Sequence, residues 1–85
     1  MAVRILYFAS VRDAMGREAE AIDLPAGVAT VAGLVDWLAT RDAAGAAAFA
    51  DRTRLRAAID QRVAPLDAPV ADGQEVALFP PVTGG

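Results

Sequence analysis

Short runs of apolar residues predict two strands at the start of the chain. Residues 2–8 (AVRILYF) are rich in β-branched and aromatic side chains and predict the first strand. A short helical segment over residues 10–15 follows, and Gly16 ends it. Residues 18–24 (EAEAIDL) alternate polar and apolar positions, which predicts the second strand. Its apolar side chains are expected to face inward, namely those of Ala19, Ala21 and Leu24.

The strongest helical pattern lies in the middle of the chain. Thr30 is a suitable N-cap for a helix over residues 31–42, because its hydroxyl oxygen can accept a backbone N–H. Apolar residues recur there with the i, i+3, i+4, i+7 spacing of one helical stripe, at Val31, Leu34, Val35 and Leu38. Residues 43–51 (AAGAAAFAD) predict a second, weaker helix, which we expect Gly45 to loosen.

The last third of the chain predicts three further strands. Residues 55–60 and 63–66 form two of them, joined by a turn at Gln61-Arg62. The third covers residues 75–79 (EVALF), after a tight turn at Asp72-Gly73.

Two prolines, Pro80 and Pro81, then end the sheet, because proline lacks the amide hydrogen that a ladder needs. The element order predicts an α+β domain in which the main helix packs across one face of a mixed sheet. We expect residues 1–79 to form this domain and residues 80–85 to form an extended tail.

The first and last strands are apolar on both faces, whereas the main helix can cover only one face of the sheet. Phe8 and Phe79 fall on the other face. They either form an exposed patch of the kind that marks a partner site, or lie under the short helices as ordinary core.

Composition argues against several classes of function. The 85 residues carry a net charge of −3, all eight basic residues are arginine, and Cys and His are absent. The usual nucleophiles and the neutral-pH proton carrier are therefore missing, which argues against a catalyst that acts alone. The acidic balance argues against nucleic acid as a partner, and we expect no metal site. Without a run of ~18 apolar residues or a signal peptide, we expect no membrane span and a cytoplasmic location.

The end of the chain, FPPVTGG, carries the most distinctive chemistry. Two prolines favour a stiff, extended stalk, and the terminal glycines are slender enough to enter a narrow channel. A carboxylate is a poor electrophile, so it must be activated before it reacts, most simply as an acyl-adenylate. The segment suits a carboxylate that is presented to other proteins for activation.

Three segments resemble one family over nearly the whole chain: ILYFASVRDAMG, LRAAIDQ and ADGQEVALFPPVTGG. The chain is similar to the small, sulfur-carrier subunits of molybdopterin synthase, which are ubiquitin-like β-grasp proteins. The FPPVTGG ending after a DG turn and a short strand is the most specific of these features.

The resemblance implies a sulfur carrier in molybdenum cofactor biosynthesis. An E1-like, ATP-dependent enzyme would adenylate Gly85, and sulfur from a donor would then replace AMP to leave a thiocarboxylate. The chain itself would bind no cofactor. The tail would enter the large catalytic subunit of a heterotetramer, where two transfers convert cyclic pyranopterin monophosphate into the dithiolene of molybdopterin. The inserted residues would be Pro80, Pro81, Val82, Thr83, Gly84 and Gly85.

The resemblance also implies contacts with the large subunit at Phe8, Arg12, Val63 and Phe79. From the residues alone, Arg12 is better explained as a solvated surface charge, which is the usual environment of an arginine. Asp60 departs from the family, which often has Asn in that turn, and this leaves the turn's hydrogen bonding open. Three arginines, Arg52, Arg54 and Arg56, either attract an acidic partner or form a solvated face.

Other functions remain open at this point. The chain could be a sulfur carrier for thiamin or cysteine synthesis, or a ubiquitin-like modifier joined to lysines through Gly85. A plain interaction module with an inert tail is the third alternative. All but the last use the same activated terminus and differ in its acceptor.

Overall fold

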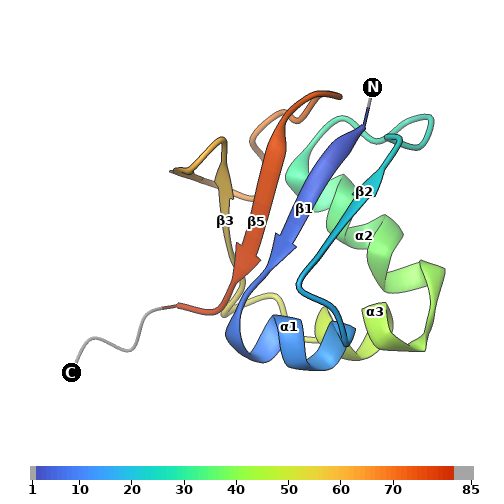
Figure 1. Ribbon diagram of the computed structural model, residues 1–85, viewed down its shortest axis with the longest axis vertical. Helices are drawn as coiled ribbons and strands as arrows, with labels where there is room; N and C mark the ends of the chain where they lie inside the picture. Colours follow the sequence, from blue (N-terminus) through green and yellow to red (C-terminus); the bar gives the residue numbers. More distant parts are fainter. Residues whose placement is uncertain (1, 82–85) are drawn as a thin grey trace.

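A computed structural model describes residues 2–81, and within this range the chain forms a five-stranded mixed sheet with three helices (Figure 1). The strands and helices in chain order are β1 (Val3–Tyr7), α1 (Ala9–Met15), β2 (Ala19–Ile22), α2 (Val31–Arg41), α3 (Ala43–Ala48), β3 (Arg56–Ile59), β4 (Arg62–Ala64) and β5 (Glu75–Phe79).

The first and last strands lie side by side in the middle of the sheet. The strand order is β2-β1-β5-β3-β4; β1 and β5 are parallel, and the other neighbours are antiparallel. In Figure 1 the sheet lies in front of α2, while α1 lies beyond the ends of β1 and β5. The predicted α+β architecture, with one main helix across one face of a mixed sheet, is confirmed.

The core lies between α2 and the face of the sheet that it covers. Thr30 caps α2 as predicted, since its Oγ1 accepts a hydrogen bond from the Gly33 amide at 3.0 Å. The four residues of the predicted stripe are fully buried, and they pack against β1 and β5 residues that are also fully buried: Val3, Ile5, Val76 and Leu78. Burial of this apolar surface is the main stabilising term for so small a domain.

Gly45 does not loosen α3, contrary to the prediction. Its backbone packs directly against the end of α2, where a Cβ atom at this position would lie 1.8 Å from the Leu38 carbonyl oxygen. The Asp42 carboxylate caps α3 by accepting from the Gly45 amide at 2.8 Å. Glycine is needed here because any side chain would push the two helices apart.

The inward-facing residues of β2 also differ from the prediction. Ala19 and Ala21 are exposed, while Glu20 and Ile22 face the helices. The register explains this, because Ile5 pairs with Glu20 and cross-strand partners share a face of the sheet. A charged residue takes the inward position at this edge because it has partners there, which are described below.

The β3–β4 hairpin turns one residue earlier than predicted. Asp60 and Gln61 both have positive φ, at 50° and 71°, and Arg62 already belongs to β4. Positive φ at both central residues is the geometry of the tight turn that matches the twist of the flanking strands. Aspartate tolerates this conformation, and its Oδ1 accepts a hydrogen bond from the Glu75 amide at 3.0 Å. Asp60 therefore supports the turn through its own side chain.

Candidate functional site

The base of the tail is held in the centre of the sheet. Because β1 and β5 are parallel, Phe8 and Phe79 reach the same edge together, and the Phe8 amide donates to the Leu78 carbonyl at 3.1 Å. Pro80 and Pro81 follow and are half-buried. The tail therefore leaves from a strand that is paired on both sides, so its first residues are fixed relative to the surface around them.

The face of the sheet opposite α2 carries an apolar row across all five strands. The row is built by register, because each member pairs with the next on the neighbouring strand: Ala19, Leu6, Ala77, Ala58 and Val63. Ala58 and Ala77 in the middle of the row are buried, whereas Val63 at its end is 80% exposed. An open apolar face of this kind is typical of a protein-binding surface.

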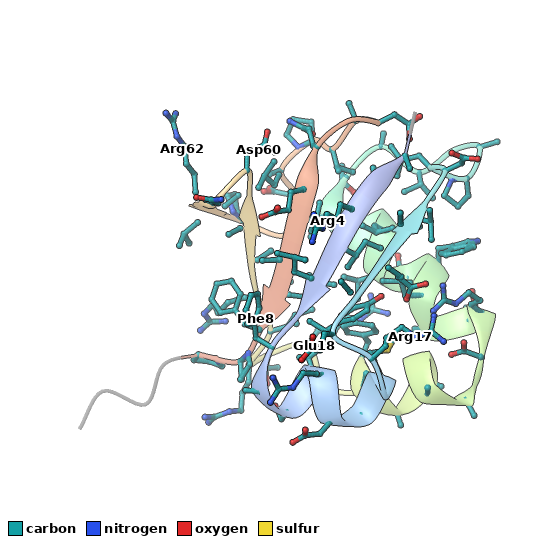
Figure 2. The ribbon with its side chains drawn as sticks, viewed as in Figure 1. Arg4, Phe8, Arg17, Glu18, Asp60 and Arg62 are labelled. Atoms are coloured by element: carbon teal, nitrogen blue, oxygen red, sulfur yellow. The ribbon has the colours of Figure 1, made fainter. Side chains whose placement is uncertain are left out.

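The structure places the predicted partner residues on or beside this face. Phe8 is 46% exposed and lies at the ends of β1 and β5 (Figure 2). Arg12 is exposed on α1 and lines the same shallow depression as Phe8. Phe79 is half-buried at the end of β5, and Val63 lies farther away on the edge strand β4. Of the predicted tail, Pro80 and Pro81 are described, while Val82, Thr83, Gly84 and Gly85 lie outside the described residues.

The sequence analysis missed two features near the predicted residues. One is the apolar row itself, which depends on the pairing of Leu6 with Ala77 and so on a strand order that no local pattern shows. The other is a depression of ≈ 180 Å³ beside Pro80, with Ser10, Leu55 and Arg54 among its lining residues. Only the meeting of α1 with the loop before β3 creates it.

A separate charged cluster fixes β2 to the helices. Arg41 donates to both carboxylate oxygens of Glu20, at 2.7 and 2.9 Å, and the Tyr7 hydroxyl donates to Glu20 Oε2 at 2.6 Å. The hydrogen bonds from Arg41 hold the pKa of Glu20 below its ordinary value, against the opposing effect of burial. Burial and the hydrogen bond to Glu20 raise the pKa of Tyr7, so the phenol stays neutral and remains a donor. The cluster lies under β2, on the opposite face of the sheet from the apolar row, and its role is structural.

Replacing Glu20 by glutamine should destabilise the fold. The Glu20→Gln variant removes the carboxylate that accepts two hydrogen bonds from Arg41 and leaves this partly buried charge with Asp42 alone, at 3.3 Å, which should lower the free energy of unfolding by about 1–3 kcal/mol at pH 7. Because the folded pKa of Glu20 is lowered, its contribution is complete above the unfolded pKa of about 4.3 and is lost as the pH falls through the folded value. The difference from wild type in urea unfolding should therefore shrink below about pH 4.

The matched control is Glu18→Gln, since Glu18 is exposed and has no ion pair among residues 2–81. Equal stabilities of the two variants at pH 7 would show that the Glu20 cluster contributes nothing.

The side chains of the open face and the start of the tail are suited to binding another protein. No helix within residues 2–81 is long and apolar enough to cross a membrane. The face offers an aromatic side chain, an aliphatic row and arginines around the start of a tail, which are the groups that bind a protein. In the full sequence, no Cys, His or Lys is available as a nucleophile.

Comparison with known proteins agrees with this geometry. The profile of the ThiS family matches residues 5–85, which includes both the domain and the Gly-Gly end. The chain belongs to the ThiS family.

Two curated relatives of this ThiS-family chain match along nearly its whole length. The molybdopterin synthase sulfur carrier subunit of Escherichia coli (strain K12) is 41% identical, over 98% of this chain and 99% of its own. The protein of the same name from Haemophilus influenzae is 37% identical over the same shares. Among solved structures, SAMP1 from Haloferax volcanii is 26% identical with a TM-score of 0.73, and the match covers 100% of both chains. The fold is thus the ubiquitin-like β-grasp that the sequence resemblance predicted.

Proposed function

We propose that this ThiS-family protein is the sulfur carrier of molybdopterin synthase in molybdenum cofactor biosynthesis. The observation that carries the proposal is the full-length match to molybdopterin synthase sulfur carrier subunits at 34–41% identity. The family match extends to residue 85 and so includes the glycines that would do the chemistry.

The Gly85 carboxylate is the group that changes chemically. On an E1-like enzyme it attacks ATP to form an acyl-adenylate with release of pyrophosphate. Sulfur at the oxidation level of sulfide, supplied by a donor, then displaces AMP and loses its proton to leave a thiocarboxylate. The composition supports a passive role for the chain in these steps, since it has no thiol, imidazole or lysine amine of its own. The activating enzyme binds the ATP, and the chain binds no cofactor.

The loaded tail, residues 80–85, then enters the large catalytic subunit of a heterotetrameric synthase. That subunit supplies the catalytic residues for two sulfur transfers, which convert cyclic pyranopterin monophosphate into the dithiolene of molybdopterin. The chain is therefore the sulfur-donating, non-catalytic subunit of a sulfurtransferase, and it works in the cytoplasm. The parallel pairing of β1 with β5 supports this role, because it fixes the base of the tail.

The open face of the sheet is the surface that contacts the large subunit. Phe8, Phe79 and Val63 would bury their exposed apolar area there, with Arg12 at the edge. Their exposure supports this proposal, since solvent-facing Phe8 and Val63 add little to the stability of the free domain.

Truncating Phe8 should weaken binding and leave the fold intact. An aromatic anchor at an interface typically contributes 2 kcal/mol or more, so Phe8→Ala should raise the Kd for the large subunit by about 30-fold or more. Calorimetric titration measures the Kd, and thermal unfolding measures the stability. The control is Phe49→Ala, because Phe49 is only 2% exposed and its loss should cost about 3–5 kcal/mol of stability. A Phe8→Ala variant as unstable as Phe49→Ala, with normal binding, would make Phe8 part of the core.

A reconstitution tests the pathway itself. Thiocarboxylated protein, mixed with the large subunit and cyclic pyranopterin monophosphate, should yield molybdopterin. If no molybdopterin forms and sulfur is instead transferred to an acceptor of thiamin or cysteine synthesis, the protein is a sulfur carrier for that pathway.

A modifier function is the second candidate. The structural similarity to SAMP1, the small archaeal modifier protein 1 of Haloferax volcanii, favours it. It predicts adducts in which Gly85 is joined to lysines of other proteins in cell extracts. The higher identity to the molybdopterin synthase subunits supports the carrier role over this one.

A further inference from the structure

Three arginines lie near the start of the tail, each beside a different residue at that end of the sheet. Arg12 lines a depression of ≈ 320 Å³ together with Phe8. Arg56 on β3 pairs in register with Phe79 at the end of β5. Arg54 lines the second depression, together with Pro80. We call Arg12, Arg54 and Arg56 the arginine triad; all three residues are exposed.

No arginine of the triad forms an ion pair with a carboxylate among residues 2–81, although the chain is acidic. The sequence carries eleven carboxylate residues for eight arginines. Arg17 and Arg41 pair with Glu20, and Arg52 pairs with Asp36, whereas no member of the triad has a carboxylate within 4.0 Å among residues 2–81. Arg52 therefore differs from its two neighbours in sequence, because Asp36 on α2 pairs with it. Arg54 and Arg56 lie with Arg12 near the start of the tail.

Two carboxylates lie near the triad without forming an ion pair with it. Asp51 lines the depression beside Arg54, and its carboxylate accepts hydrogen bonds from the Thr53 amide and hydroxyl, at 3.0 and 2.6 Å. Glu18 is exposed and lines the depression of Arg12 and Phe8, and neither carboxylate lies within 4.0 Å of a triad guanidinium among residues 2–81. Arg56 donates from Nη1 to the Leu55 carbonyl at 3.0 Å, which holds its guanidinium near the surface without neutralising it. The three guanidinium groups therefore remain available to carboxylates of another protein.

We infer that the partner surface around the opening that receives the tail is acidic, and that its carboxylates pair with Arg12, Arg54 and Arg56. The inference rests on the proposed function and specifies the partner's chemistry: the large synthase subunit presents carboxylates at the mouth of its channel. The triad steers the approach, because opposite charges around a docking point raise the association rate. The steering orients the domain with its tail toward the channel.

A nucleotide phosphate is a poorer occupant for the triad than a carboxylate. Six residues, 80–85, lead from the sheet to the terminal carboxylate, and in an extended chain they span about 19 Å at ~3.1 Å per residue. An adenylate on Gly85 would therefore lie far from the arginines whenever the tail is extended in a channel. A protein surface at the mouth of that channel is within their reach.

Association kinetics with the purified large subunit test the inference. Stopped-flow measurements compare the wild type with Arg12→Gln, Arg54→Gln, Arg56→Gln and the triple variant, between about 20 and 300 mM salt. Each single variant should associate about threefold more slowly at low salt, and the triple variant about 20-fold more slowly, with little change in the dissociation rate. The triple variant should also lose most of the salt dependence. Thermal unfolding confirms that each variant is folded.

Arg62→Gln is the matched control. Arg62 is exposed on the β3–β4 hairpin, at the opposite end of the sheet from Phe8 (Figure 2), and has no ion pair among the described residues. Its substitution removes the same charge and should leave the association rate within about 1.5-fold of wild type at low salt. Replacement of the triad by lysine should retain the fast rate, because steering depends on charge.

Three results would overturn the inference while leaving the proposed function intact: a triple variant that associates as fast as wild type, one that associates faster, or an equal loss in Arg62→Gln. A wild-type chain that does not bind the large subunit at all would remove the proposed function and this inference together.

Discussion

Adding one tryptophan after Gly85 should reduce sulfur transfer by at least about 100-fold and leave the fold unchanged. The extension moves the carboxylate outward by roughly 3.3 Å and adds an indole where the sequence has only slender glycines. A misplacement of even 1 Å can reduce a positioned reaction about 100-fold. Molybdopterin formation with the large subunit measures transfer, and intact mass shows whether the extended chain accepts sulfur.

A second extension, by one glycine, separates length from bulk. It displaces the carboxylate equally but adds no side chain, so any difference between the two variants reports on the width of the channel. Unchanged transfer by the tryptophan variant would mean that the terminus is not the reacting group.

Gly45→Ala should be the most destabilising single-methyl change within residues 2–81. The added Cβ would lie 1.8 Å from the Leu38 carbonyl oxygen and 2.7 Å from its carbon, and both are backbone atoms that cannot rotate away. Separating α2 from α3 should cost about 3 kcal/mol. For a domain of this size the melting temperature should fall by roughly 12–24 °C.

Gly33→Ala is the control, because Gly33 also lies in a helix and the change is the same. Its Cβ would meet Thr30 Oγ1 at 3.4 Å, an ordinary contact, so the change should be neutral or stabilise by up to about 1 kcal/mol. If the two variants melt at the same temperature, the close approach of α2 and α3 is not a feature of the folded protein.

Local sequence patterns predicted the elements that depend on local physics. The stripe of α2, the Thr30 cap and the end of α1 at Gly16 follow from helical periodicity and backbone preferences, and the structure confirms all three. The final strand has the predicted limits, because a tight turn precedes it and Pro80 follows it. The family resemblance predicted the β-grasp arrangement, which no local pattern specifies.

The wrong predictions concern residues whose surroundings come from elsewhere in the chain. The alternation in β2 placed its alanines inward, but Arg41 on α2 and Tyr7 on β1 make the inward position suitable for Glu20. Gly45 was expected to weaken its helix, because helix propensity describes an isolated helix. In the folded protein its role is to allow close packing against the Leu38 backbone of α2.

The candidate site was predictable in part. Two-sided apolar strands indicated that Phe8 and Phe79 lie on an open face; Phe8 is exposed, whereas Phe79 is half-buried. Val63, which the family resemblance indicated, is also exposed. The arginine triad was not predictable, because its members come together only after α1 meets the loop before β3 and after β3 pairs with β5.

The central claim is that Gly85 carries sulfur. The most direct test is the intact mass of the protein purified from its own cells with its native terminus. A thiocarboxylate replaces one oxygen by sulfur and should add about 16 Da, located by fragmentation at Gly85. An unmodified mass in every preparation, including after incubation with ATP, the activating enzyme and a sulfur donor, would contradict the proposed function.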